Sequence, residues 1–169
     1  LKFVCFSRTL IGYNNDFMTI TKGFGIYNHV FLEYRPSKPM AFRGRKNGVL
    51  VSMASGKATA YAMIKLEDRG IMLIEPGTEV YEGMIVGINN NTGDISVNVS
   101  KAKEQTNVRS ANKDNTVVIK KSKILSLEES IQFLEDDEYC EVTPESIRLR
   151  KKFLNKGERA RFIKNRSED

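Results

Sequence analysis

The sequence predicts an α+β fold, and three observations support this prediction. Residues 2–34 hold an extended run, an amphipathic segment and a second extended run, which is the order of a β-α-β unit. From residue 48 onward, short runs rich in Val and Ile alternate with turn signals such as N-N-N-T-G, a pattern typical of hairpins. Helix-start patterns there open only short segments. We therefore expect a mostly antiparallel β domain with a few short helices after the β-α-β unit.

The β-α-β unit is predicted from its periodicity. Residues 2–7 and 26–34 are strand-like, and Gly23 follows the intervening segment 9–22 as a C-terminal cap. The apolar side chains of that segment recur three or four positions apart, as on one face of a helix, at Leu10, Tyr13, Phe17 and Ile20. Since one such unit does not close a core, we expect the chain to be part of a longer protein.

A composition change separates this unit from the rest. The stretch R-P-S-K-P-M-A-F-R-G-R-K-N-G holds two prolines, two glycines and five basic residues. We place a linker at 37–47, between a first unit at 1–36 and a second domain at 48–169.

The second domain is predicted to hold short strands divided by turns. Residues 58–69 are ambiguous, because their alanines favour a helix while a hairpin partner for the preceding strand is equally natural; we expect a strand that passes into a helical turn before Gly70. The expected strands are 48–53, 71–74, 80–88, 94–99, 116–119, 138–142 and 146–151.

A helix is predicted near residue 126. Ser126 and Glu129 match a capping box, and Leu127, Ile131 and Leu134 form an apolar stripe. The acidic residues of this segment are then expected to face solvent.

The C-terminal strand is predicted to alternate. Ile147 and Leu149 are expected to point inward, while Arg148 and Arg150 point outward together. Asn155 then caps a last basic helix, and the chain is expected to fray after about Arg161.

The charge distribution indicates a polyanionic partner. The net charge is +6, and basic blocks at 1–50, 101–125 and 146–169 are interrupted by 126–145, which holds eight acids and no base. Such blocks suit nucleic acid, although a single block is more often a solvated face. The longest apolar runs fall far short of the roughly 20 residues of a membrane span.

The sequence offers little for catalysis or metal binding. G-V-L-V-S-M-A-S-G-K-A-T fails as a phosphate-binding loop, because Val51 stands where glycine is needed and Ala58 where serine or threonine is needed. Cys5 and Cys140 lack Cys or His companions at metal-ligand spacing and are expected to be buried free thiols, and His29 is the only histidine. We expect no catalytic site, no metal site and no cofactor in this segment.

Three basic regions are candidates for RNA binding: the polar stretch 100–115, the strand end 148–152 and the linker. Lys and Arg neutralise phosphates, and the few aromatics near them favour recognition of RNA shape and backbone over base reading. The predicted RNA contacts are Lys101, Lys103, Thr106, Asn107, Arg109, Lys113, Arg148, Arg150, Lys151, Lys152, Arg43, Arg45 and Lys46.

Several motifs resemble the C-terminal part of the BipA/TypA translational GTPases, in consistent order over nearly the whole chain. They include L-I-G-Y-N-N-D-F-M-T-I-T-K-G-F-G-I, G-K-A-T-A-Y-A, E-V-Y-E-G-M-I-V-G-I, K-E-Q-T-N-V-R-S and E-V-T-P-E-S-I-R-L-R-K. The resemblance implies that residues 1–36 are half of a ferredoxin-like unit similar to domain V of elongation factor G. It also implies that the second domain is the one peculiar to this family.

The resemblance implies a cytoplasmic, ribosome-binding protein linked to large-subunit assembly and to growth under cold or stress. Its partners would be large-subunit ribosomal RNA and the acceptor end of the A-site tRNA, with stretch 100–115 reaching toward the peptidyl-transferase region. GTP and Mg²⁺ would belong to a G domain upstream, and the protein would be monomeric and not membrane-bound. The alternative is a protein-interaction or structural domain that uses the acidic helix 126–138 without direct RNA contact.

Overall fold

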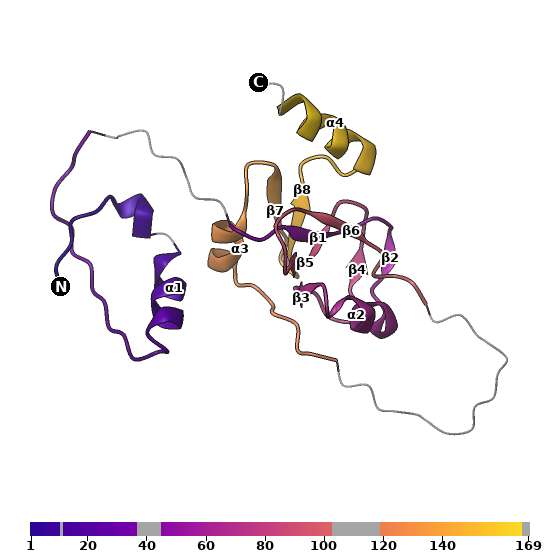
Figure 1. Ribbon diagram of the computed structural model, residues 1–169, viewed down its shortest axis with the longest axis horizontal. Helices are drawn as coiled ribbons and strands as arrows, with labels where there is room; N and C mark the ends of the chain where they lie inside the picture. The colour runs from indigo at the N-terminus through magenta and orange to yellow at the C-terminus, as the bar shows by residue number, and fades with distance from the viewer. Residues whose placement is uncertain (11, 37–44, 103–118, 167–169) are drawn as a thin grey trace. The chain divides into compact units, whose positions relative to one another are not determined.

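The computed structural model describes residues 1–10, 12–36, 45–102 and 119–166 (Figure 1). The chain divides into two compact units, Leu1–Gly44 and Arg45–Asp169. The division falls within the linker predicted at 37–47. Within the described ranges, no helix is long and apolar enough to cross a membrane.

The first unit is built around one helix. A 3-10 helix, η1 (Ser7–Leu10), precedes α1 (Tyr13–Ile20). The Phe17 ring lies between Tyr13 and Tyr27, with ring centroids 5.8 and 5.5 Å away, so three aromatic rings form the small apolar centre of this unit. Gly23 has a φ of +81° and its N–H donates to the Met18 carbonyl over 2.8 Å, which confirms the predicted C-terminal cap.

The strands expected at 2–7 and 26–34 are not present among the described residues of this unit. Ser7 belongs to η1, and residues 2–6 and 26–34 form no strand. Their apolar side chains are exposed: Phe3 is 82% exposed and Val30 is 89% exposed. A strand needs a partner to satisfy its backbone hydrogen bonds, and neither segment has one here. The β-α-β expectation is therefore wrong for the paired strands and right for the helix between them.

The second unit confirms the α+β class. Its main sheet has the order β3-β5-β1-β6, in which β5 is antiparallel to β3 and β1 while β6 is parallel to β1. Two-stranded antiparallel sheets, β2–β4 and β7–β8, complete the mostly antiparallel arrangement. The strands are β1 (Val49–Ser52), β2 (Gly56–Lys57), β3 (Gly70–Met72), β4 (Glu79–Val80), β5 (Ile85–Asn89), β6 (Ile95–Val97), β7 (Glu138–Val142) and β8 (Ile147–Lys151).

The central strand β1 divides the core of this unit into two clusters. Leu50 packs with Met63 and with Val86, all fully buried. Val49 and Val51 pack with Leu149 of β8 in a second cluster, which Phe133 joins. Since successive side chains of a strand point to opposite faces, β1 is covered on both sides and reads as a continuous apolar run.

The ambiguous segment 58–69 folds as a helix, α2 (Ala60–Leu66), so the strand expected there is wrong. The Thr59 hydroxyl accepts a hydrogen bond from the Ala62 N–H over 3.2 Å and caps its start. Ala62, Met63 and Leu66 are buried against the sheet. The helical propensity of alanine and this cap therefore decided the conformation.

Helix α3 (Leu127–Phe133) begins as predicted, because Ser126 and Glu129 form the capping box. The predicted stripe is only partly correct: Leu134 packs against the core, as does Phe133. Ile131 is 57% exposed and Leu127 is 38% exposed. The helix also ends at Phe133, five residues before the expected end.

The remaining elements follow the predicted order with local differences. Ile147 is 38% exposed, so the inward residues of β8 are Leu149 and Lys151. Helix α4 (Lys156–Arg166) continues beyond the point where fraying was expected. Both cysteines are free, but Cys5 is exposed rather than buried. Of the strand expected at 116–119, residues 116–118 lie outside the described residues.

Candidate nucleic-acid interface

The hairpin of β7 and β8 presents basic side chains on one face. The turn T-P-E-S closes it through hydrogen bonds between Thr143 and Ser146. Its register pairs Tyr139 with Arg150 and Glu141 with Arg148. Directly paired residues share a face of the sheet, so Arg148, Arg150 and Tyr139 lie together. We call these three residues, with Lys152 that follows the strand, the β8 outer face.

Neighbouring side chains hold Arg150 in place. Its Nε lies 2.5 Å from Oε1 of Glu141, and its guanidinium carbon lies 5.2 Å from the centroid of the Tyr139 ring. The Tyr81 hydroxyl donates to the other oxygen of Glu141 over 2.6 Å. Burial, followed by this hydrogen bond, raises the pKa of Tyr81. Arg150 is therefore pre-positioned, with its side chain 24% exposed.

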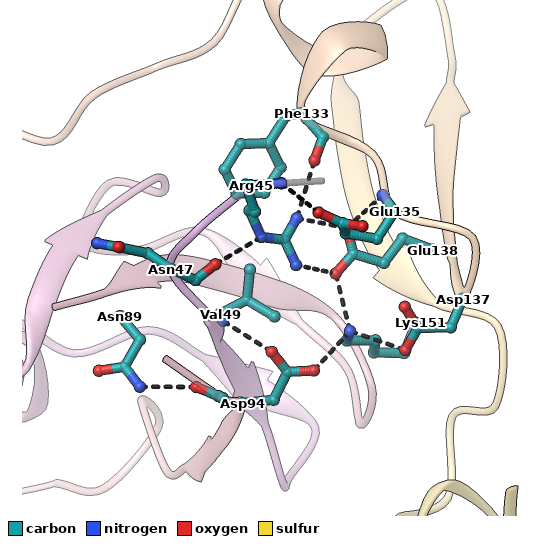
Figure 2. Close-up of polar contacts among 11 residues, drawn as sticks. Arg45, Asn47, Val49, Asn89, Asp94, Phe133, Glu135, Asp137, Glu138 and Lys151 are labelled. Atoms are coloured by element: carbon teal, nitrogen blue, oxygen red, sulfur yellow. Dashed lines mark hydrogen bonds and ion pairs between the residues drawn. The ribbon is translucent and has the colours of Figure 1, made fainter. Parts of the chain in front are cut away.

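The inner face of the same strand is different. The ammonium of Lys151 lies 2.5 Å from Asp94, 2.9 Å from Asp137 and 2.8 Å from Glu138, and only 3% of its side chain is exposed (Figure 2). Burial alone lowers the pKa of Lys151, but the carboxylates that bind it reverse the direction and raise the pKa overall. Lys151 was predicted to contact RNA, and the structure places its charge among carboxylates instead.

Arg45 belongs to the same arrangement. Its guanidinium makes a bidentate pair with Glu138, whose side chain is fully buried, and donates to the Phe133 carbonyl over 2.8 Å (Figure 2). The Phe133 ring lies 4.4 Å from the guanidinium carbon. Arg45 was also predicted to contact RNA, but both terminal nitrogens of its guanidinium bind the carboxylate of Glu138. We call Arg45, Asp94, Asp137, Glu138 and Lys151 the ion-pair network.

The network also corrects the prediction that the acids of 126–138 are solvated. Glu138 and Asp137 bind cations, and the backbone N–H of Arg45 donates to Glu135 over 2.5 Å. Part of the acidic block therefore compensates buried basic residues within the domain.

An open pocket of about 580 Å³ lies beside the network and is lined by Lys46, Gly93, Asp136 and Phe162, among others. Its charged residues of both signs include four of the five network members, so much of its charge is already compensated. In the described part of the chain, no group of three His, Cys, Asp or Glu side chains could hold a metal ion.

The remaining predicted residues separate into two groups. Lys46 is exposed beside the network, and Lys101 is exposed just after β6, in a different pocket. The six that lie outside the described residues are Arg43, Lys103, Thr106, Asn107, Arg109 and Lys113. Among the predicted residues that the structure describes, Lys46 and Lys101 therefore line separate pockets.

Sequence reasoning missed the aromatic residues of the interface. Tyr139 and Tyr81 are distant in sequence from Arg150, and neither lies within a basic stretch of the sequence. The signal was available for Tyr139, because the turn T-P-E-S fixes the hairpin register and places residue 139 opposite residue 150. No comparable pattern connects Tyr81 to this face.

The fold and the site define a small α+β domain with a basic strand face, fixed internally by a buried ion-pair network. Residues 47–156 match the family model described as the TypA/BipA C-terminal domain. The chain belongs to the TypA/BipA family.

Three relatives illustrate the similarity, and each carries the name large ribosomal subunit assembly factor BipA. The Bacillus subtilis protein is 60% identical over 166 residues, which cover 98% of this chain and 27% of the relative. The Synechocystis protein is 49% identical, over 89% of this chain and 25% of its own length. The Haemophilus influenzae protein is 45% identical, over 95% of this chain and 26% of its own length. The chain thus spans about a quarter of the relatives it matches.

Proposed function

We propose that this chain is the ribosome-binding C-terminal module of a BipA/TypA-like translational GTPase. The observation that carries the proposal is its 60% identity to a relative named as a large ribosomal subunit assembly factor. The β8 outer face supports it, because a positioned arginine and exposed cations suit the phosphates of a folded RNA. GTP hydrolysis, with its GTP and Mg²⁺, would then belong to a part of the longer protein that this chain does not cover.

The proposal includes specific contacts. The β8 outer face would bind large-subunit ribosomal RNA, and the stretch 100–115 would reach the acceptor end of the A-site tRNA. The protein would act as a monomer in the cytoplasm, in subunit assembly and in growth under cold or stress. Most of the stretch 100–115 lies outside the described residues, so its support is its composition and the family resemblance.

Co-sedimentation with purified large ribosomal subunits at several salt concentrations tests the proposal. The variant Arg148→Gln/Lys152→Gln removes two cations of the β8 outer face and leaves the Arg150–Glu141 pair intact. If both contact phosphates, affinity falls and the slope of log K against log salt flattens by about two units. Lys57→Gln/Lys121→Gln removes the same charge from exposed positions outside this face and is the matched control. Equal behaviour of the two variants would contradict the assignment of this face.

The stretch 100–115 needs its own variant. Lys101→Ala/Lys103→Ala/Arg109→Ala is expected to weaken subunit binding and to flatten the salt dependence by about one unit for each lost phosphate contact. An unchanged affinity and slope would remove this stretch from the interface.

A second candidate is a protein-interaction surface at α3, and the exposure of Ile131 and Ile124 favours it. Glu128 on the same helix is also exposed. Under this hypothesis, Glu128→Lys/Ile131→Ser lowers affinity for intact subunits, with little change for protein-free ribosomal RNA. The β8 variant would lower both if RNA is the ligand, so the two candidates give different results.

A further inference from the structure

A second basic site lies between helix α2 and the chain that leaves β6. It is a pocket of about 220 Å³, and Lys65, Arg69 and Lys101 stand exposed at its rim. Its floor is apolar and buried: Ala62 is 4% exposed and Val97 is 3% exposed. No carboxylate is among the described residues that line it.

The spacing of the helix places three side chains of the pocket in one row. Tyr61, Lys65 and Arg69 are four positions apart, so they follow one side of α2 and of the turn after it. The Lys65 ammonium lies 4.3 Å from the centroid of the Tyr61 ring, which is half-buried. An aromatic ring and an exposed cation are thus adjacent at the edge of the pocket.

Two hydrogen bonds from Thr59 fix the opposite wall. The Thr59 N–H donates to the Val99 carbonyl over 2.8 Å, and the Thr59 hydroxyl donates to the Lys101 carbonyl over 2.7 Å. Asn98 also lines the pocket, and its Oδ1 accepts from both the N–H and the hydroxyl of Ser100 over 3.0 Å. The wall that carries Lys101 is therefore held against the first turn of α2.

The chemistry of this site suits one unit of a single-stranded nucleic acid. Three cations around an apolar floor can neutralise a bent phosphate backbone, and a half-buried tyrosine ring can stack on an unpaired base. The volume is below the 300–1,000 Å³ that is typical of sites enclosing a whole small molecule. A segment of a longer strand, rather than a free nucleotide, therefore fits the pocket.

We propose that Tyr61, Lys65, Arg69 and Lys101 form a subsite for single-stranded RNA, in which the cations bind phosphates and the Tyr61 ring stacks on a base. The inference rests on the proposed function, and it assigns to that function three residues, Tyr61, Lys65 and Arg69, that the sequence did not indicate. The subsite would bind an unpaired strand, while the β8 outer face binds folded RNA.

Fluorescence anisotropy with a fluorescein-labelled U12 strand tests this subsite in the full 169-residue chain. Lys65→Gln/Arg69→Gln/Lys101→Gln is expected to weaken binding about tenfold or more at 0.1 M salt, and to flatten the salt slope by about two units. Tyr61→Leu is expected to weaken binding about fivefold or more, as loss of base stacking does, while Tyr61→Phe binds like the unaltered protein. Unchanged melting temperatures confirm that these exposed substitutions leave the fold intact.

Matched probes separate the subsite from general charge attraction. Lys2→Gln/Lys121→Gln/Lys156→Gln removes three positive charges from exposed positions outside the pocket and is expected to cost less affinity for U12. A duplex RNA and a poly-glutamate peptide of equal charge are expected to compete poorly. Three results would each overturn the subsite: equal loss in the two triple variants, no effect of Tyr61→Leu, or competition by the peptide or duplex as strong as by unlabelled U12.

The two proposals fail separately. If the chain binds large subunits but the pocket variants bind U12 normally, the subsite is wrong and the proposed function stands. If the chain binds U12 through the pocket but does not sediment with large subunits, the proposed function is wrong and the subsite stands as a single-strand RNA site.

Discussion

The two faces of strand β8 carry similar cations with opposite surroundings. On the inner face, Lys151 is 2% exposed and is bound by three carboxylates. On the outer face, Arg148 is partly exposed and Lys152 after the strand is exposed. Residues one position apart thus face either the domain interior or a possible ligand. Residue type alone does not distinguish a buried, ion-paired cation from an exposed one, but the alternation of side chains along the strand does.

The largest expected effect comes from the inner face. Lys151→Met keeps the length of the side chain but removes the ammonium, which leaves the buried Glu138 with Arg45 as its remaining cation. Breaking a buried pair on one side costs about 3–5 kcal/mol. Urea unfolding followed by circular dichroism measures the loss, and a cost below about 1 kcal/mol would show that the network does not stabilise the domain.

Deprotonation of Lys151 and Tyr81 at high pH is expected to lower the free energy of unfolding by a smaller amount. The folded-state pKa of Lys151 is raised above its ordinary value of 10.5, and that of Tyr81 is raised above 10.0. Each group therefore contributes stability that is fully present below its unfolded pKa and is lost as pH rises through its folded pKa. We expect the free energy of unfolding to fall above about pH 10, measured by urea titrations at pH 8 and pH 11. The Lys151→Met variant should show a shallower fall, and an equal fall in both proteins would contradict the role of Lys151.

An intermediate loss of stability is expected from removing the cap of helix α2, which lines the pocket between α2 and the chain after β6. Thr59→Ala removes the cap of α2 and the hydrogen bond to the Lys101 carbonyl. Loss of a threonine cap costs about 1 kcal/mol, and the melting temperature should fall accordingly. Thr59→Ser keeps the hydroxyl and is the control, since it should retain most of the stability.

The smallest effect on stability is expected on the outer face. Arg148→Gln should change the free energy of unfolding by less than about 0.5 kcal/mol, because surface substitutions away from buried partners rarely do more. Its effect should appear in the affinity for large subunits instead. A stability loss comparable to that of Lys151→Met would remove the contrast between the two faces.

Much of the second domain could be predicted from local sequence. The strand G-V-L-V-S-M, the turn N-N-N-T-G and the capping box at Ser126 correspond to observed elements, because each depends on residues within a few positions. The prediction of a strand within 58–69 was wrong, because the helical propensity of its alanines and the Thr59 cap favoured a helix over a hairpin strand. The predictions of strands at 2–7 and 26–34 were wrong, because a strand forms only where a partner strand pairs with it, and no local sequence pattern reveals that partner.

The site was harder to predict than the fold. The hairpin register places Glu138 directly opposite Lys151, but Arg45 is 93 positions away from Glu138, so its part in the compensation is visible only after folding. Tyr61, Lys65 and Arg69 could have been found by their spacing of four, had the segment been recognised as helical. The roles of Lys65 and Arg69 could therefore be predicted only once the segment 58–69 was known to be a helix.

The ion-pair network also bears on the order of folding. Arg45 and Glu138 are 93 positions apart, and Asp94 is 45 positions from Val49, whose N–H donates to its carboxylate over 2.9 Å. Closing such long loops costs entropy before the contacts return any free energy, so the network should complete late, after the main sheet has formed. Substitutions in it should then accelerate unfolding and leave the folding rate nearly unchanged. The network would set how long the folded domain persists rather than how fast it is reached.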